Sequence, residues 1–313
     1  MFQSFVSPSP KELPVQIVRV CFSDGSPVRS AVLTGQGLHP LPVGFHELLS
    51  GSAAELRTAV ESAVAAEPVP TSAGRLRAPV GGLTEVWAAG VTYQRSRQAR
   101  MEESEKEADI YDRVYEAERP ELFFKAASWR VSGPDEAISV RADSAVNVPE
   151  PELAVVANRQ GEIVGYTICN DVSSRSIEGE NPLYLPQAKA YLGACAVGPG
   201  VTPAWEVTDP RALVILMSIE RDGEIVWKGE ANTSQLHREL PDLVAYLFRE
   251  DEFPQGVVLA TGTSLVPDLP FTLAAGDLVS IELTGLGVLT NRVTVGKAGV
   301  GHLIERVAEE QGQ

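Results

Sequence analysis

After residue 120, hydrophobic residues fall into short runs that are separated by turn residues, a pattern typical of β-strands. Residues 153–156 and 162–168 flank Asn158-Arg159-Gln160-Gly161, so this region is predicted to be a hairpin. The same pattern predicts paired strands over 213–228 and over 278–293. We therefore expect the larger part of the chain to be mainly β.

The N-terminal part has a different pattern. Residues 14–35 are expected to form two strands around a turn. Residues 45–66 carry leucine and valine at nearly helical spacing and are expected to form one helix. The proline- and serine-containing stretch 67–74 is predicted to be a linker, so we divide the chain into domains 1–74 and 75–313. The predicted fold class is α+β, mainly β, with a small N-terminal α/β domain.

Two further segments have helical character. Residues 97–118 are highly charged, and they are equally compatible with a solvated surface helix and with a lid over a site. Residues 235–249 place leucine, valine and phenylalanine on one helical stripe. Pro241 either starts a new helix within this segment or kinks the existing one.

Composition narrows the class of protein. The chain has 313 residues and a formal net charge of −16, which argues against a nucleic-acid-binding protein. No apolar run is long enough to span a membrane, and the first residues lack the basic and apolar segments of a secretory signal. The three cysteines match no zinc or disulfide spacing. We expect a cytoplasmic protein with reduced thiols.

The segment Pro149-Glu150-Pro151-Glu152-Leu153 is the most informative part of the chain. Its two prolines exclude a helix and favour an extended backbone, in which residues two apart share a face. Glu150 and Glu152 therefore point the same way, and Asp171 follows the return strand of the hairpin. Three carboxylates without a nearby histidine favour magnesium or manganese over zinc. On spacing alone, paired glutamates at a strand edge are more often solvated than bound to a metal.

Three motifs follow one another in this region, namely PEPELAVV at 149–156, GYTI at 165–168 and NDVSSR at 170–175. Together they resemble the metal-site pattern of the fumarylacetoacetate hydrolase family, which carries E-x-E-L, then G-Y-T, then N-D-x-S-x-R. Shorter matches extend the resemblance over roughly residues 80–298.

This resemblance implies a fold and a cofactor. The expected fold of the larger domain is the mixed β-sheet roll of the family. The expected metal is Mg2+, with Mn2+ or Ca2+ as alternatives, and the residues that match the family's ligands are Glu150, Glu152 and Asp171. One departure is Ser176, at a position where the family commonly has aspartate.

Residues 119–126 and 180–189 are similar to the dehydratases of the family that act on 2-keto-3-deoxypentonates. The resemblance implies that Glu121 and Lys189 are the proton-transfer pair, without deciding which is acid and which is base. Without it, Lys189 is expected at the surface and Glu121 in a salt bridge with Arg119 or Lys125.

Four further residues are expected to contact the substrate: Thr263, Arg175, Ser96 and Phe124. Arg175 either binds the substrate carboxylate or holds Asp171 in place. Hydrolases of the family carry N-Y-x-x-H-x-x-E, and the histidine and glutamate of that motif activate water. Ser96 and Ala99 stand at those two positions here, and neither can act as that base.

The resemblance therefore implies dehydration of a 2-keto-3-deoxypentonate to 2,5-dioxopentanoate. The implied partner is a small-molecule 2-oxo sugar acid, with no nucleic acid or membrane, and the implied assembly is a homodimer or homotetramer. Two alternatives stay open. One is a hydrolase that cleaves a carbon–carbon bond of a diketo acid or acylpyruvate. The other is a non-enzymatic protein that keeps a metal site for structure.

Overall fold

A hairpin of two strands, β10 (Pro151–Ala157) and β11 (Ile163–Asp171), lies at the centre of the fold. It is the hairpin predicted from the sequence. In its turn, the Asn158 side-chain oxygen accepts hydrogen bonds from the backbone N–H groups of Gln160 and Glu162, at 3.0 and 2.9 Å. These bonds fix the reversal of the chain and therefore the register of the two strands.

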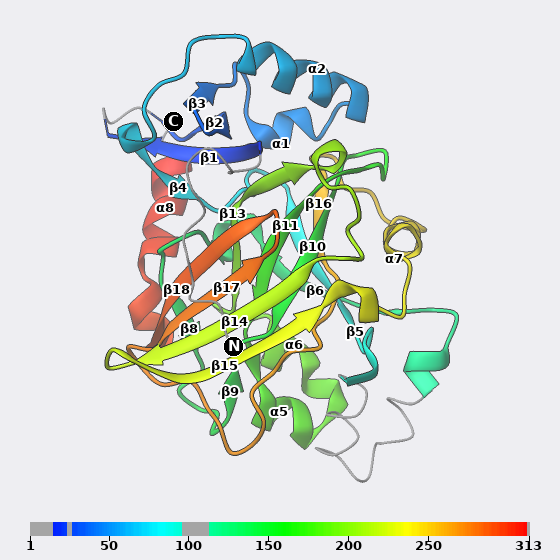
Figure 1. Ribbon diagram of the computed structural model, residues 1–313. Coiled ribbons are helices and arrows are strands. Elements are labelled where there is room, and N and C mark those ends of the chain that lie inside the picture. The colour runs from blue at the N-terminus through cyan, green and yellow to red at the C-terminus, as the bar shows by residue number, and fades with distance from the viewer. Residues whose placement is uncertain (1–14, 24–26, 96–112, 312–313) are drawn as a thin grey trace.

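The structure is a computed structural model that describes residues 15–23, 27–95 and 113–311. β10 and β11 belong to a mixed sheet that runs through the molecule (Figure 1). Across this sheet the strands are ordered β3 (Gly37–Pro40), β2 (Arg29–Thr34), β1 (Gln16–Phe22), β13 (Cys195–Pro203), β11, β10, β16 (Val257–Ala260), β5 (Glu85–Gly90) and β6 (Glu121–Ala127), with β4 (Gly74–Arg77) paired to β1 and β7 (Val131–Ser132) paired to β13.

A second sheet packs against one face of the first (Figure 1). Its strands are ordered β15 (Glu224–Asn232), β14 (Val214–Arg221), β17 (Leu278–Leu283), β18 (Gly287–Val295) and β8 (Ile138–Val140). The strand pairs predicted over 213–228 and 278–293 are the hairpins β14–β15 and β17–β18. The short strands β9 (Asn147–Val148) and β12 (Ser173–Ser174) form a separate pair. The mainly β class and the mixed sheets are as expected.

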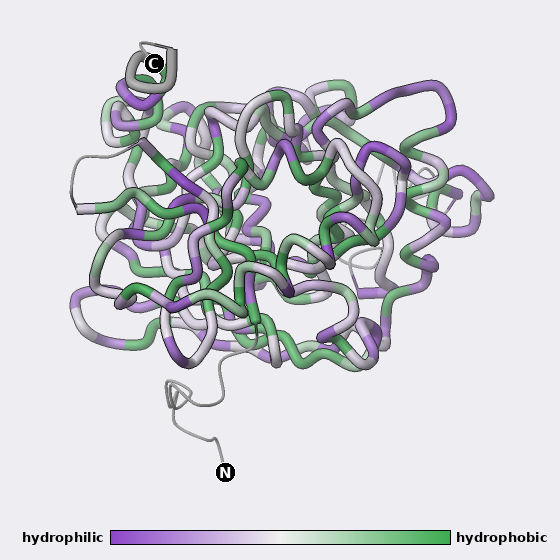
Figure 2. The backbone as a smooth tube through the Cα atoms, turned by 90° about the horizontal axis from the view of Figure 1, so that it is seen from above, coloured by the Kyte–Doolittle hydropathy of each residue, from purple (hydrophilic) through white to green (hydrophobic). Residues whose placement is uncertain are grey.

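The side chains of β10 connect two hydrophobic cores. Leu153 and Val155 enter the core between the two sheets, whereas Ala154 and Val156 enter the core on the opposite face, under the N-terminal helices. This alternation follows from the period of two along a strand. Because β10 is buried on both faces, its sequence is continuously apolar after Glu152. Figure 2 shows the most hydrophilic stretches mainly toward the periphery.

Helices surround the sheets (Figure 1). The α-helices are α1 (Phe45–Leu48), α2 (Ala53–Val64), α5 (Arg175–Glu180), α6 (Leu185–Lys189), α7 (Leu240–Leu247) and α8 (His302–Gln311). Short 3-10 helices cover Thr71–Ala73, Ser128–Arg130, Pro182–Tyr184, Ala204–Glu206, Thr233–Gln235 and Lys297–Val300. Among the described helices, none has both the length and the apolar character needed to cross a membrane.

The single helix predicted over 45–66 is wrong, because the segment forms the two helices α1 and α2. Ser52 starts the second one. Its hydroxyl accepts a hydrogen bond from the backbone N–H of Glu55 at 3.3 Å, and the Glu55 carboxylate accepts one from the backbone N–H of Ser52 at 2.7 Å. This reciprocal cap is a strong helix start and overrides the continuous apolar spacing.

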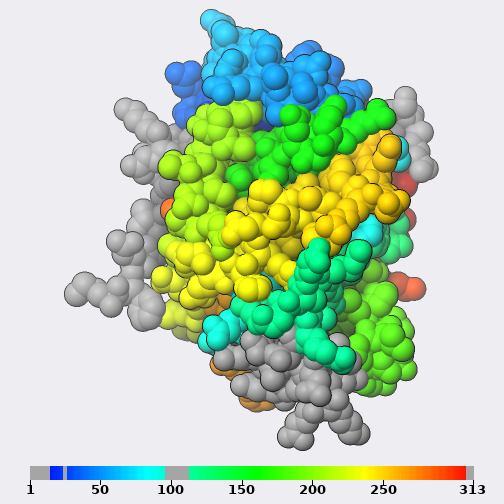
Figure 3. All heavy atoms as spheres, turned by 90° about the vertical axis from the view of Figure 1, so that its right-hand side faces the viewer, coloured from blue at the N-terminus to red at the C-terminus, as the bar shows by residue number. Residues whose placement is uncertain are grey.

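The helix predicted over 235–249 begins only at Leu240, with Pro241 in its first turn. Pro241 therefore starts a helix and does not kink one. A proline is tolerated in the first turn because the backbone N–H groups there have no intrahelical acceptor. Residues 113–118 lie against α7 (Figure 3), and Tyr246 donates a hydrogen bond to Glu118 at 2.9 Å. The rest of the charged stretch, at 97–112, falls outside the described residues.

The N-terminal elements form one end of the molecule (Figures 1 and 3). Their strands continue the large sheet, because β1 pairs with β13 through Ile17 and Val201. β4 begins at Gly74, where the linker was expected to end, and it returns to pair with β1. A domain boundary near residue 74 stays a prediction.

We predict that Leu153→Ala destabilises the protein strongly, because the side chain is fully buried between the two sheets. A large-to-small change in such a core costs roughly 2–5 kcal/mol. Urea unfolding followed by tryptophan fluorescence measures the difference. Leu269→Ala is the control, since Leu269 is 59% exposed and should be nearly neutral. Equal effects of the two substitutions would contradict the assigned core.

Candidate metal centre and substrate pocket

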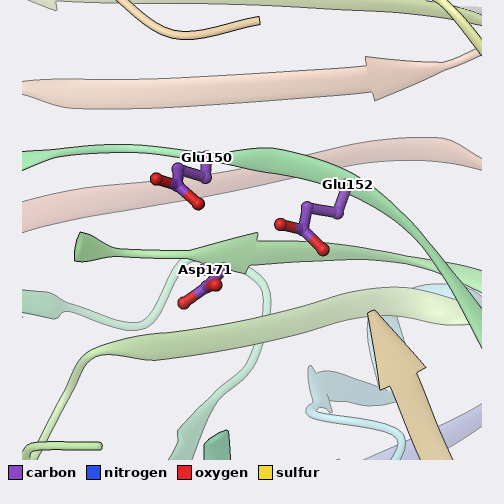
Figure 4. A group of neighbouring side chains, drawn as sticks. All are labelled: Glu150, Glu152 and Asp171. Carbon is purple, nitrogen blue, oxygen red and sulfur yellow. The ribbon is translucent and has the colours of Figure 1, made fainter. Parts of the chain in front are cut away.

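Three carboxylates meet at one end of the two central strands of the large sheet. Glu150 immediately precedes β10, Glu152 lies within it, and Asp171 ends β11. The strands are antiparallel, with Pro151 opposite Asn170, so the start of one lies beside the end of the other. One carboxylate oxygen of each residue lies within 4.8 Å of the others, and the three side chains approach one another (Figure 4). All three are at most 3% exposed.

The electrostatics of this carboxylate triad favour a cation. Burial raises the pKa of Glu152 well above its ordinary value, and the negative charges of Asp171 and Glu150 raise it further. The backbone N–H of Gly262 donates a hydrogen bond to Glu152 at 2.7 Å, which only partly offsets these effects. A divalent ion would remove the repulsion, so the triad fits one. Because all ligand atoms are oxygens, magnesium fits better than zinc.

A neighbouring thiol does not belong to this ligand set. Cys169 lies directly opposite Glu152 across the β10–β11 pairing and is fully buried. A hydrogen bond with Cys195 and burial raise the pKa of the Cys169 thiol well above its ordinary value. Because only the thiolate is an effective ligand, this cysteine acts as a small core residue.

Lys189 ends α6, and its ammonium reaches into the triad. Its Nζ donates hydrogen bonds to Glu150 Oε2 at 2.7 Å, to Asp171 Oδ2 at 2.9 Å and to Ser173 Oγ at 2.5 Å. The ring centroid of Phe123 lies 5.7 Å from the same nitrogen. Lys189 is 1% exposed, so it is not the surface lysine that its residue type alone suggests.

Glu121 lines the same pocket from β6. Gly90 lies directly opposite on β5, and a Cβ atom at Gly90 would lie 1.9 Å from Glu121 Oε2. The absence of a side chain at Gly90 therefore makes room for the Glu121 carboxylate. The pocket has about 380 Å³ of empty space, its open mouth included. Glu121, Lys189 and the carboxylate triad all line it.

Arg175 and Thr263 also line this pocket. Arg175 starts α5 and donates a hydrogen bond to Glu150 Oε1 at 3.0 Å, so the candidate ligand it holds is Glu150. Thr263 follows the glycine that contacts Glu152, and its hydroxyl accepts a hydrogen bond from the backbone N–H of Leu265 at 3.1 Å.

The structure does not bring Phe124 to the pocket. Successive side chains on a strand point to opposite faces, and the residues of β6 that line the pocket are Glu121 and Phe123. Phe124 is 36% exposed and packs edge-on against Trp87, with ring centroids 6.0 Å apart. The aromatic wall is therefore Phe123. Ser96 lies outside the described residues.

Sequence reasoning also missed Glu178 and Lys125. Glu178 is 2% exposed, lines the pocket and lies 3.9 Å from Arg175, measured from Oε2 to Nε. Its position three residues after Arg175 was the available signal, since that spacing shares a helix face. Lys125 is 1% exposed and forms an ion pair with Asp171. Its signal was the period of two that places it on the same face of β6 as Glu121 and Phe123.

The sequence model of a known family, described as fumarylacetoacetate (FAA) hydrolase C-terminal, matches residues 85–294, which is more than half of the chain. The chain belongs to the fumarylacetoacetate hydrolase family. The match spans all three carboxylates of the triad, together with Glu121 and Lys189. The resemblance read from the motifs at 149–175 is thereby confirmed.

Two relatives from archaea share long stretches with this member of the fumarylacetoacetate hydrolase family. A protein of Haloferax volcanii, named probable 2-keto-3-deoxyxylonate dehydratase, is 56% identical over 210 residues, which cover 67% of this chain and 72% of the relative. A protein of Saccharolobus solfataricus, named 2-dehydro-3-deoxy-D-arabinonate dehydratase, is 43% identical over 212 residues. These residues cover 67% of this chain and 71% of the relative.

A solved structure supports the same grouping within the fumarylacetoacetate hydrolase family. The structure of 2-keto-3-deoxy-D-arabinonate dehydratase complexed with magnesium and 2,5-dioxopentanoate superposes with a TM-score of 0.77. The two sequences are 34% identical, and the superposition covers 90% of this chain and 99% of the other. The similarity therefore extends over the N-terminal region as well as the pocket.

We predict that Glu152→Gln weakens Mg2+ binding, because it removes one negative charge from the triad and keeps the side-chain shape. Replacing a residue that only holds a metal ligand in place reduces metal affinity roughly 10- to 100-fold. Replacing a ligand itself should therefore cause a larger loss. Isothermal titration calorimetry with Mg2+ measures it. Glu136→Gln is the control, because that largely buried carboxylate is paired with Arg77 and Arg306 away from the pocket. Unchanged affinity in Glu152→Gln would refute the assignment.

Proposed function

We propose that this protein is a magnesium-dependent dehydratase that converts a 2-keto-3-deoxypentonate to 2,5-dioxopentanoate and water. One observation carries the proposal: a buried lysine and a glutamate share one pocket with a triad of carboxylates. The dehydratase names of the two archaeal relatives, and the magnesium and 2,5-dioxopentanoate in the similar solved structure, support the choice of substrate and metal.

Glu150, Glu152 and Asp171 would hold the metal, which when bound supplies positive charge at the 2-oxo group and stabilises the charge that develops there. Arg175 and Thr263 line the pocket wall, and we expect them to contact the substrate carboxylate. Phe123 covers Lys189 from one side and limits access of water to its ammonium.

Glu121 and Lys189 would carry the protons. One of them removes a proton from C3, and the other donates a proton to the C4 hydroxyl. The electrons of the C3–H bond then form a C3–C4 double bond, while the C4–O bond breaks and water leaves. The two groups enter the pocket from different elements, β6 and α6, so they can face different sides of one bound substrate.

The unsaturated acid must then become an aldehyde. Removal of a proton from C5 and return of one to C3 moves the double bond to C4–C5, which makes an enol. Protonation of this enol at C4, with loss of the proton from its C5 hydroxyl, gives the C5 aldehyde of 2,5-dioxopentanoate. These steps are isomerisations with no net redox change, so they need no oxidant or reductant. The same pair of side chains can carry each proton.

The hydrolase alternative has less support. A hydrolase must activate water against a carbonyl, but Ser96 and Ala99 stand where the family's hydrolases carry their histidine and glutamate. On the resemblance to the family, the proposal also includes a cytoplasmic location and assembly as a homodimer or homotetramer. Analytical ultracentrifugation measures the assembly.

We predict that the purified protein with Mg2+ forms an aldehyde from a 2-keto-3-deoxypentonate, measured by coupling to a semialdehyde dehydrogenase. Exhaustive EDTA treatment should abolish this activity, and Mg2+ or Mn2+ should restore it. Cleavage of an acylpyruvate, with no turnover of either C4 epimer of the 2-keto-3-deoxypentonate, would establish the hydrolase alternative. Metal binding without turnover of any 2-oxo acid would indicate a non-enzymatic protein.

We predict that Glu121→Gln and Lys189→Met each lower kcat by roughly two to four orders of magnitude, the usual scale for a general acid or base. Gly90→Ala should also lower kcat, because its new methyl group displaces the Glu121 carboxylate. Gly301→Ala is the matched control, since a Cβ there meets only one atom, at 3.8 Å. Normal turnover in both Glu121→Gln and Lys189→Met would show that the proton-transfer pair is wrong.

A further inference from the structure

Lys125 is a buried lysine that lies beneath the pocket. It belongs to β6, and it is 1% exposed. Its Nζ donates hydrogen bonds to the backbone carbonyl of Val172 at 2.9 Å and to the backbone carbonyl of Lys189 at 2.6 Å. The same nitrogen forms an ion pair with Asp171 Oδ1. Two hydrogen bonds and one ion pair therefore hold this ammonium in place.

These acceptors belong to different parts of the site. Asp171 is a candidate metal ligand at the end of β11, and Val172 directly follows it. Lys189 is the last residue of α6, and its carbonyl is one of those that a helix end leaves without an intrahelical donor. Lys125 therefore ties β6, which carries Glu121, to both β11 and α6.

The Asp171 carboxylate is held on both of its oxygens. Lys125 contacts Oδ1, whereas Lys189 donates to Oδ2 at 2.9 Å. Two cations on opposite oxygens fix the plane of a carboxylate, because rotation would break one of the contacts. Lys189 lines the pocket and donates to Glu150, a candidate metal ligand, so a bound metal and substrate would lie beside it. Lys125 is enclosed and does not line the pocket.

We propose that Lys125 is a positioning residue that sets the orientation of Asp171 and the distance between Glu121 and Lys189. The inference rests on the proposed dehydratase function. Lys125 does not touch the pocket, so it acts through the groups it holds. Residues that hold a metal ligand in this way change metal affinity or activity roughly 10- to 100-fold when they are replaced.

The test compares Lys125→Met with a matched control. Methionine retains the unbranched chain and removes the charge and all three donors. The control is Arg306→Met. Arg306 is 6% exposed, forms an ion pair with Glu136 at 3.3 Å, and donates to the backbone carbonyls of Trp129 and Val131, away from the pocket. Both substitutions remove a buried cation that ties two carbonyls and a carboxylate together.

We expect Lys125→Met to lower kcat roughly 10- to 100-fold while KM stays nearly unchanged, because substrate-binding groups remain in place. The electron paramagnetic resonance spectrum of bound Mn2+, recorded without substrate, should also change, since the Asp171 carboxylate is no longer held on Oδ1. Arg306→Met should leave kcat and this spectrum unchanged. Lys125→Gln, a shorter polar replacement, serves if the methionine variant does not fold.

Wild-type kcat and an unchanged Mn2+ spectrum in the Lys125 variants would overturn the inference. An equal loss of kcat in Arg306→Met would also overturn it, because the effect would then be a general loss of stability. Absence of dehydration by the wild-type protein would reject the proposed function instead. The Mn2+ spectrum tests the link between Lys125 and Asp171 independently of that result.

Discussion

Repulsion between three buried carboxylates is the constraint on which the site depends. One carboxylate oxygen of each residue lies within 4.8 Å of the others, and two unit charges at about that distance repel each other by roughly 3–4 kcal/mol at an effective dielectric constant near 20. The fold offsets this repulsion with cations from three elements, since Lys125, Lys189 and Arg175 enter from β6, α6 and α5.

The surrounding backbone holds the triad in place. β10 is packed on both faces, so the segment that carries Glu152 has little freedom to move. Beside it, Gly262 has a φ of +94°, and a Cβ there would lie 1.9 Å from the hydroxyl of Thr92. That hydroxyl donates to the carbonyl of Thr261 at 2.6 Å. Only glycine allows this close approach, which aims the Gly262 N–H at Glu152.

Local patterns predicted most of the sheets and the convergence of Glu150, Glu152 and Asp171, because strand period and hairpin direction are encoded within short segments. They did not predict the break between α1 and α2, where a serine cap outweighs the apolar spacing. They also missed Lys125, since an ion pair with Asp171 depends on tertiary packing. The prediction that Phe124 contacts the substrate was wrong, because it rested on nearness to Glu121 in the sequence and did not consider that side chains of β6 alternate between two faces.

Side chains of β6 alternate between its two faces, and this alternation decides which residues can line the pocket. Glu121, Phe123 and Lys125 occupy one face of this strand, and Leu122 and Phe124 occupy the other. A substitution at one of these positions changes a single group. The loss or gain of one residue between 121 and 125 would exchange the two faces unless a bulge absorbed it, as one already does at Lys125, which lies between the residues paired with the adjacent Trp87 and Val86. The pocket wall can therefore diversify by substitution, whereas a change in its length requires a further bulge in β6.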